Sequence, residues 1–408
     1  METMKTLPGS ENHGRYSLFK RLNVLFVALC CLFASEGFDF YSYGVLAITA
    51  IAALYCLFHD GFFNNWRNLP LPVFFPLILA FYTAVSPGHW FKDLPVGDKM
   101  LASYVAGFSA AWFFPGSYHI AIFSLPLALA VSFFVCGAGG FSDSCFAGCR
   151  LILFSGNPNK LSFLAGAGVL AAIFASRQLK GRYRNFAIFA GGVNMLILIL
   201  TSSRAALGAT FLSILFVGVV FLRRHFLKIV LGLLISGLAV FFFLPSAERD
   251  RLGCAISAPS QDETLKRRVA IWDVAVAGIK QRPFIGNALR SFRKFYADYT
   301  TANYASLSAK YGEFKEDPSH PHNLVLGLAY MYGLIGLPLF FLAFVPALRL
   351  AFLHGGFIFI AFLLFSFLNG MFDFNLHRVA GSLLLFFPLG LEYGRLARNH
   401  IKPDTPVG

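Results

Sequence analysis

Charged side chains are scarce in this sequence. Asp, Glu, Lys and Arg make up 13% of its 408 residues, whereas hydrophobic residues make up 57%. Soluble domains carry about 25% charged residues, so the composition excludes a water-solvated globule. The short alternating apolar segments of a membrane β-barrel are also missing. Apolar runs long enough to cross about 30 Å of hydrocarbon recur instead, and they predict an all-α polytopic membrane protein.

Sequence motifs for nucleotide or hydrolase chemistry are missing as well. The chain has no Walker loop, no dinucleotide-binding glycine fingerprint and no nucleophile elbow, which argues against a nucleotide-driven pump and a serine hydrolase. The apolar runs are also almost free of charged residues, whereas a transporter or flippase would carry them in mid-span on several helices. A non-catalytic transporter is therefore the least favoured class.

The apolar runs predict about twelve transmembrane helices and one large loop. The predicted spans are 22–35, 41–58, 70–86, 99–114, 119–136, 159–176, 186–201, 205–222, 229–244, 323–347, 355–371 and 379–391. The chain then divides into helices 1–9 (1–244), a large periplasmic loop (245–321), helices 10–12 (322–391) and a cytoplasmic tail (392–408).

Basic residues set the predicted orientation, because Lys and Arg near span ends stay cytoplasmic. Lys20 and Arg21 precede the first span, and basic clusters follow the sixth, eighth and twelfth. With twelve spans, all four clusters fall on one side, so both termini are cytoplasmic and the large loop faces outward. The formal net charge of +14 is spread between the spans. That distribution indicates contact with membrane lipids and no nucleic-acid partner.

The large loop contains a predicted amphipathic helix over 264-TLKRRVAIWDVAVAGIK-280. Its apolar residues at helical spacing are Leu265, Val269, Trp272, Val276 and Ile279. Such a helix is expected to lie on the membrane surface or over the helix bundle. Arg267 and Arg268 lie near its start, on the outer side of the membrane.

Arg204 is the most informative polar residue on the outer side. It lies in 201-TSSRAALGAT-210, at the turn between the seventh and eighth spans, among small residues that let a phosphate approach. A guanidinium at membrane depth is usually paired or functional, and it can grip phosphate through two parallel hydrogen bonds. The alternative is an interfacial arginine that extends to the lipid headgroups.

Two histidines, His320 and His322, close the large loop, directly before the tenth span. An imidazole so placed can remove a proton from a substrate hydroxyl. A single histidine at a helix end more often only bonds to a carbonyl. Here two arginines are expected nearby, and their charge disfavours the protonated imidazole, so it remains a usable base at neutral pH. Asp373, His377 and Arg378 in the last outer loop are the other polar groups on this side.

Cysteine spacing leaves disulfide pairing open. Cys145 and Cys149 lie on the oxidising side, and Cys254 in the large loop is a conceivable partner for either. No local histidine or second cysteine pair accompanies them, so the sequence predicts no metal site there.

The segment 322-HNLVLGLAYMYGLIG-336 has a His-Asn pair, nine residues, and then Gly-x-x-Gly. It resembles the signature shared by O-antigen ligases, O-antigen polymerases and bacterial O-linked protein oligosaccharyltransferases. The similarity extends to the large loop before the histidine, to 202-SSRAALGA-209 and to 268-RVAIWDVAVAGIKQRPFIGNA-288. It covers roughly residues 150–380.

The resemblance implies a glycosyltransferase of the bacterial inner membrane that needs neither metal nor cofactor and whose active site faces the periplasm. Its donor would be a glycan linked to undecaprenyl diphosphate. Arg204 and Arg268 would bind the diphosphate, and His322 would act as general base in an inverting reaction. Supporting roles would fall to His320, Asn323, Arg267 and Arg378.

Within this superfamily the sequence favours an O-antigen ligase that joins the glycan to the lipid A–core oligosaccharide. One outer loop dominates, and its basic character suits a phosphorylated, anionic acceptor. An O-antigen polymerase, which often has two sizeable outer loops, is the alternative. The chain is expected to be a monomer.

Overall fold

The computed structural model describes a set of residues that begins at Met100. They are residues 100, 103–104, 107–108, 118–139, 145–147, 150–153, 157–221, 227, 231–232, 235, 242, 263–287, 291–312, 317–354, 356–373 and 385–395. The predicted spans 22–35, 41–58 and 70–86 lie outside them, as do most of 99–114 and 229–244. These spans stay predictions.

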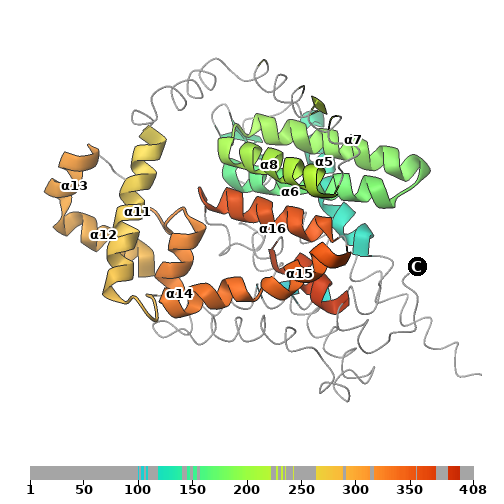
Figure 1. Ribbon diagram of the computed structural model, residues 1–408. Helices are drawn as coiled ribbons and strands as arrows, with labels where there is room; N and C mark the ends of the chain where they lie inside the picture. Colours follow the sequence, from blue (N-terminus) through green and yellow to red (C-terminus); the bar gives the residue numbers. More distant parts are fainter. Residues whose placement is uncertain are drawn as a thin grey trace, which may run out of the picture.

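Four apolar helices pack together on one side of the molecule (Figure 1). They are α5 (Tyr118–Ala138), α6 (Pro158–Gln178), α7 (Gly181–Leu200) and α8 (Arg204–Phe221). The start of α6 is fixed by Asn157, whose side chain accepts hydrogen bonds from the backbone N–H groups of Asn159 and Lys160. Pro158 in the first turn suits a helix start, because its missing N–H would have no partner there. The bounds of these four helices agree with the predicted spans to within a few residues.

A small hairpin and a disulfide join α5 to α6. The strands β1 (Phe146–Ala147) and β2 (Arg150–Leu151) pair in antiparallel fashion. Cys145, just before β1, is bonded to Cys136 near the end of α5. The sequence analysis did not consider this pairing.

The predicted span 323–347 is not one straight helix. The structure places α14 at Leu324–Leu342 and a second helix, α15, at Val345–His354. Gly333 interrupts α14 with a positive φ of 65°. A turn of the large loop fills this kink: the backbone N–H of Leu334 donates to the carbonyl of Pro283 at 2.7 Å, and that of Asn287 donates to Tyr330 at 2.7 Å.

The last described apolar helix before the final outer loop is α16 (Phe357–Gly370). It packs against α6 and α8 in the middle of the molecule (Figure 1). The ring of Phe365 stacks on Phe163 of α6 with centroids 5.3 Å apart. Gly166 leaves no room for a side chain, since a Cβ there would lie 2.6 Å from Thr210 Oγ1 and 2.7 Å from the Phe365 ring.

These contacts fix how the three helices run. Arg150 bonds to Asn159 in the first turn of α6 and to Thr201 just before α8. Phe163 in the first half of α6 stacks on Phe365 in the second half of α16. The starts of α6 and α8 and the end of α16 therefore lie at one end of the bundle. This end is called the site end below.

The large loop forms a second group of helices beyond α14, away from α5–α8 (Figure 1). It contains α11 (Glu263–Gln281), α12 (Phe292–Ala302) and α13 (Tyr304–Tyr311). These helices share a core with the first part of α14, which includes Ile271, Tyr296 and Tyr330. The amphipathic helix predicted at 264–280 is thus confirmed as a helix, and it covers α14.

The predicted apolar face of α11 is partly wrong. The buried residues are Ala270, Ile271, Val274, Ala275 and Gly278, whereas Val276 is 38% exposed. A Cβ at Gly278 would lie 2.5 Å from the Tyr330 ring. Small residues thus let α11 approach an aromatic ring closely, so the contact face includes positions that apolar periodicity does not mark.

Within the described part of the chain, three helical segments are long and apolar enough to cross a membrane. They are Pro158–Gln178, Gly181–Leu200 and Leu324–Leu353, and shorter apolar helices include Arg204–Val220 and Ile358–Gly370. The helical membrane character is confirmed, while the number of twelve spans and the loop topology stay predictions.

Candidate active site

The two histidines lie on a tight turn directly before α14. Pro321 separates them, and its ring restricts the backbone between them. His322 has a φ of 52°, a left-handed conformation that is uncommon for residues other than glycine. Backbone conformations of this kind persist where surrounding contacts hold them, and they gather at functional sites.

Asn323 holds this turn in place. Its side-chain oxygen accepts a hydrogen bond from the Leu326 backbone N–H at 3.0 Å, which makes it the N-cap of α14. Its amide nitrogen donates to the Met371 carbonyl at 3.0 Å. Asn323 is buried, so one side chain both starts α14 and ties it to the loop that follows α16.

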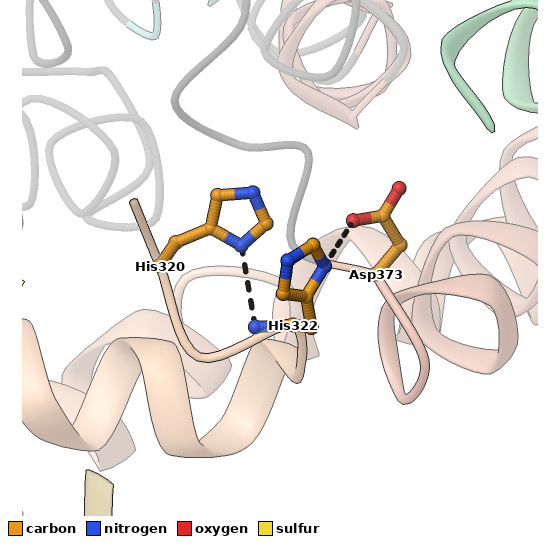
Figure 2. Close-up of side chains that lie close together, drawn as sticks. All are labelled: His320, His322 and Asp373. Carbon is orange, nitrogen blue, oxygen red and sulfur yellow. Dashed lines mark hydrogen bonds and ion pairs between the residues drawn. The ribbon is translucent and has the colours of Figure 1, made fainter. Parts of the chain in front are cut away.

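The Asn323–Met371 hydrogen bond places Asp373 next to His322. The Nδ1 atom of His322 lies 3.3 Å from Oδ1 of Asp373 (Figure 2). The His322 side chain is 31% exposed and that of Asp373 is 13% exposed, so the imidazole is reachable while the carboxylate is largely covered. A carboxylate on one ring nitrogen orients an imidazole and fixes which nitrogen carries the proton.

His320 is the more buried of the two histidines, at 4% exposure. Its Nδ1 accepts a hydrogen bond from the His322 backbone N–H at 3.2 Å, and the two rings lie 4.1 Å apart between centroids (Figure 2). His320 thus stabilises the turn that presents His322.

Arg268 reaches the same loop from α11. Its guanidinium carbon lies 5.8 Å from the centre of the Phe372 ring, within the range of a cation–π contact. Phe372 is the neighbour of Asp373 in the chain, so Arg268 contacts the loop that carries Asp373. Arg267 is exposed.

Arg204 is the first residue of α8 and therefore lies at the site end of the bundle. The turn before it includes Ser202, whose φ of 53° is again left-handed. Arg150 of β2 holds this turn: its Nε donates to the Thr201 carbonyl at 2.8 Å, and its Nη2 donates to Asn159 Oδ1 at 3.0 Å. A carbonyl at the end of α7 thereby gains a charged donor.

The start of α14 also lies at the site end, against the last residue of α16. A Cβ at Gly370, the last residue of α16, would lie 3.0 Å from the Leu324 side chain. The histidine turn and the loop 371–373 are thus at the same end as Arg204. Arg378, which the sequence analysis placed with them, lies outside the described residues.

Sequence reasoning missed two cations at the site end. Lys160, in the first turn of α6, is only 4% exposed, and Arg150 cross-links the hairpin to the α7–α8 turn. The signal for Lys160 was present, because a lysine inside a predicted span is seldom buried without a partner or a function. Arg150 lies on the two-residue strand β2, and its long-range contact leaves no local sequence pattern.

An ion pair holds the segment just before the histidine turn against α12. Arg293 Nε of α12 donates to both carboxylate oxygens of Asp317, at 2.8 and 2.9 Å. The hydrogen bonds from Arg293 hold the pKa of the Asp317 carboxyl below its usual value. Both residues are exposed, so the pair positions the chain more than it stabilises the fold.

Residues 186–341 match the family model described as O-antigen ligase. This match supports a place for the chain in the O-antigen ligase family. The match includes α7, α8 and α11–α13 and most of α14, and with them Arg204, Arg268, His320 and His322. Asp373 lies beyond the matched residues. No protein with a curated description matches the sequence.

The match to the O-antigen ligase family model indicates a class of activity. Members of this family are glycosyltransferase-like ligases or polymerases that act on a lipid-linked glycan in a membrane. The apolar helices fit this setting, since they form a multi-pass membrane protein.

Proposed function

We propose that this chain transfers a glycan from undecaprenyl diphosphate to the lipid A–core oligosaccharide. The observation that carries the proposal is the His322–Asp373 pair, with Arg268 against the adjacent Phe372. A base, a group that orients it and a phosphate-binding cation thus come together from three elements far apart in sequence.

His322 serves as the general base. With Asp373 ionised, the Nδ1–H of His322 donates to the carboxylate, and Nε2 keeps its lone pair. This nitrogen removes the proton from an acceptor hydroxyl as the hydroxyl oxygen attacks the anomeric carbon. The new glycosidic bond forms on the face opposite the diphosphate, so the anomeric configuration inverts.

Arg268 and Arg204 serve the leaving group. As the bond between the anomeric carbon and the diphosphate oxygen breaks, its electron pair goes to that oxygen and negative charge grows on the diphosphate. Guanidinium groups stabilise this growing charge more than the charge of the bound donor, which lowers the barrier. Lys160 and Arg150 add positive charge at the same end of the bundle.

The disulfide supports a periplasmic location for this site. Cys136 is near the end of α5, and the chain enters α6 at the site end. Disulfides persist in oxidising compartments such as the periplasm. The basic segment 177–184 spans the end of α6 and the start of α7, at the opposite end of the bundle. Short basic connections of this kind indicate the cytoplasmic side.

The experiment is complementation of a strain that lacks its own O-antigen ligase, with lipopolysaccharide resolved on gels. We expect the wild-type chain to restore the O-antigen ladder and His322→Ala to abolish it. His354→Ala is the matched control, because His354 ends α15 at the opposite end of α16 from the site, and it should restore the ladder fully.

Two other outcomes can be interpreted once the wild type, His322→Ala and His354→Ala are shown to be present at equal levels in the membrane. Longer lipid-linked glycans without transfer to lipid A–core would show a polymerase. Normal transfer by His322→Ala would overturn the role of His322 as the base.

A further inference from the structure

The cluster of His320, His322 and Asp373 has a second chemical property. Each residue offers a ligand atom that a metal ion can use, and the three atoms all lie within 4.8 Å of one another. We propose that this cluster binds a zinc ion, and that zinc bound there inhibits glycan transfer. The inhibition, though not the binding, rests on the proposed role of His322 as the base.

The ligand set fits zinc better than magnesium or calcium. Two imidazoles and one carboxylate are typical zinc ligands, whereas Mg²⁺ and Ca²⁺ prefer oxygen donors alone. In a tetrahedral site with bonds of about 2.0–2.1 Å, neighbouring ligand atoms lie about 3.3 Å apart. The distance between His322 Nδ1 and Asp373 Oδ1 is 3.3 Å, so this pair already has the required spacing.

His320 has to move, and the proton on His322 Nδ1 has to move to Nε2, because only a ring nitrogen without a proton can bind zinc. The His320 ring is 4.1 Å from that of His322 between centroids, and its Nδ1 accepts a backbone hydrogen bond at 3.2 Å. This distance is at the long end of the range for such bonds, so giving it up costs little. The ligand nitrogen of His320 must carry no proton, which a neutral imidazole provides through either tautomer.

The surroundings favour a stable site. His320 is buried and Asp373 is largely covered, whereas His322 is partly exposed. Two ligands therefore lose little freedom on binding, and the exposed side leaves an entry path and a fourth position for water. The turn that carries the histidines is fixed in advance by the Asn323 cap.

Zinc binding and base catalysis exclude each other. Zinc on Nδ1 of His322 leaves the ring proton on Nε2 and takes Asp373 away from its orienting role, so Nε2 has no lone pair to accept the hydroxyl proton. We therefore expect zinc to lower the transfer rate and a chelator to restore it.

Binding is measured separately from activity. The full chain, purified in detergent and stripped of metal by a chelator, is titrated with Zn²⁺ in a calorimeter, and with Co²⁺ while the visible absorption spectrum is recorded. We expect one ion per wild-type chain and a tetrahedral Co²⁺ spectrum. His320→Gln and Asp373→Asn should weaken binding at least about tenfold. His354→Gln is the matched histidine control and should bind like the wild type.

The outcomes separate the two proposals. Equal zinc affinity in the wild type and both cluster variants, or no binding at all, would overturn the metal site, whatever the effect of His322→Ala on transfer. Zinc bound at the cluster without any loss of transfer would keep the metal site and overturn the role of His322 as base. Binding at the cluster with inhibition reversed by a chelator supports both.

Discussion

At the scale of single residues, the site depends on side chains that hold other side chains. Asp373 orients His322, Asn323 ties the turn to the loop after α16, and Arg150 holds the turn before Arg204. The groups proposed to meet the substrate are thus few, and each has a described partner that sets its position.

Asp373→Asn should lower the transfer rate while leaving His322 in place. An amide presents either a donor or an acceptor to Nδ1, so it no longer enforces the tautomer with a lone pair on Nε2. We expect the turnover rate to fall about 10²–10⁴-fold, as for removal of a general base, with little change in KM for the donor. Transfer assays with purified donor and acceptor would measure both, and an unchanged turnover rate would contradict the pairing.

Arg150→Ala should weaken donor binding through the α7–α8 turn. The variant leaves the Thr201 carbonyl without its charged donor and frees Arg204 to move. We expect KM for the donor to rise several-fold, and Arg150→Lys to recover part of the loss, because a lysine makes one of the two hydrogen bonds. Kinetics at varied donor concentration would test this, and a fall in protein level alone would indicate a purely structural role.

At the scale of elements, the large loop is joined to α14 by backbone contacts in which two glycines face each other. Gly286 and Gly333 both have positive φ, and a Cβ at either would lie within 2.3 Å of a backbone oxygen of the other segment. No side chain can be added there without pushing the turn out of the kink.

Gly333→Ala should therefore destabilise the loop–helix junction. A left-handed conformation alone costs a non-glycine residue about 1–2 kcal/mol, and the contact with the Phe284 carbonyl adds to it. Gly192→Ala in α7 is the control, because nothing lies within 4 Å of the added Cβ. We expect a lower thermal midpoint for the first variant only, measured by tryptophan fluorescence in detergent.

Acid should loosen α13 from α11. Burial raises the pKa of the Asp273 carboxyl, but hydrogen bonds from Lys310 and Tyr311 outweigh it, so the pKa lies below its usual value. A lowered folded-state pKa adds stability above the unfolded value of about 3.9, and this stability is lost as the pH falls through the folded value.

Hydrogen exchange of α13 would show the effect, after correction for the intrinsic pH dependence of exchange. We expect protection to be constant between pH 7 and 5 and to drop below about pH 4. Asp273→Asn should show the lower protection at every pH. A wild-type chain whose α13 keeps full protection at pH 3 would contradict the assignment.

At the scale of the whole molecule, the site, the disulfide and the loop helices share one side of the membrane in the proposed orientation. A membrane-impermeant maleimide would test this in intact cells. Ser306→Cys on exposed α13 should be labelled directly, and Lys180→Cys on the exposed α6–α7 connection only after permeabilisation. The wild-type chain gives the background from its own cysteines, and the reverse pattern would overturn the orientation.

Local patterns in the sequence predicted the helices well. The bounds of α6, α11 and α16 lie within a few residues of the apolar patterns at 159–176, 264–280 and 355–371. The break in α14 and the true contact face of α11 were not predictable, because both depend on which distant backbone or ring fills the space beside a glycine. Asp373 was expected on the same side as His322 but was not paired with it, because the long-range Asn323–Met371 bond that joins their segments leaves no local sequence pattern.

The junction of Gly286 with Gly333 also makes the loop and helix one exchangeable cassette. Residues 263–342 carry their own core and their own backbone clamp, so chimaeras between family members that keep this segment whole should fold. A crossover between Asn287 and Tyr330 would combine the turn at 283–287 from one parent with the α14 kink at Gly333 from the other, and would not preserve the fit that the two have here. Chimaera crossovers should therefore lie before residue 263 or after residue 342, and not between the segments that these backbone hydrogen bonds join.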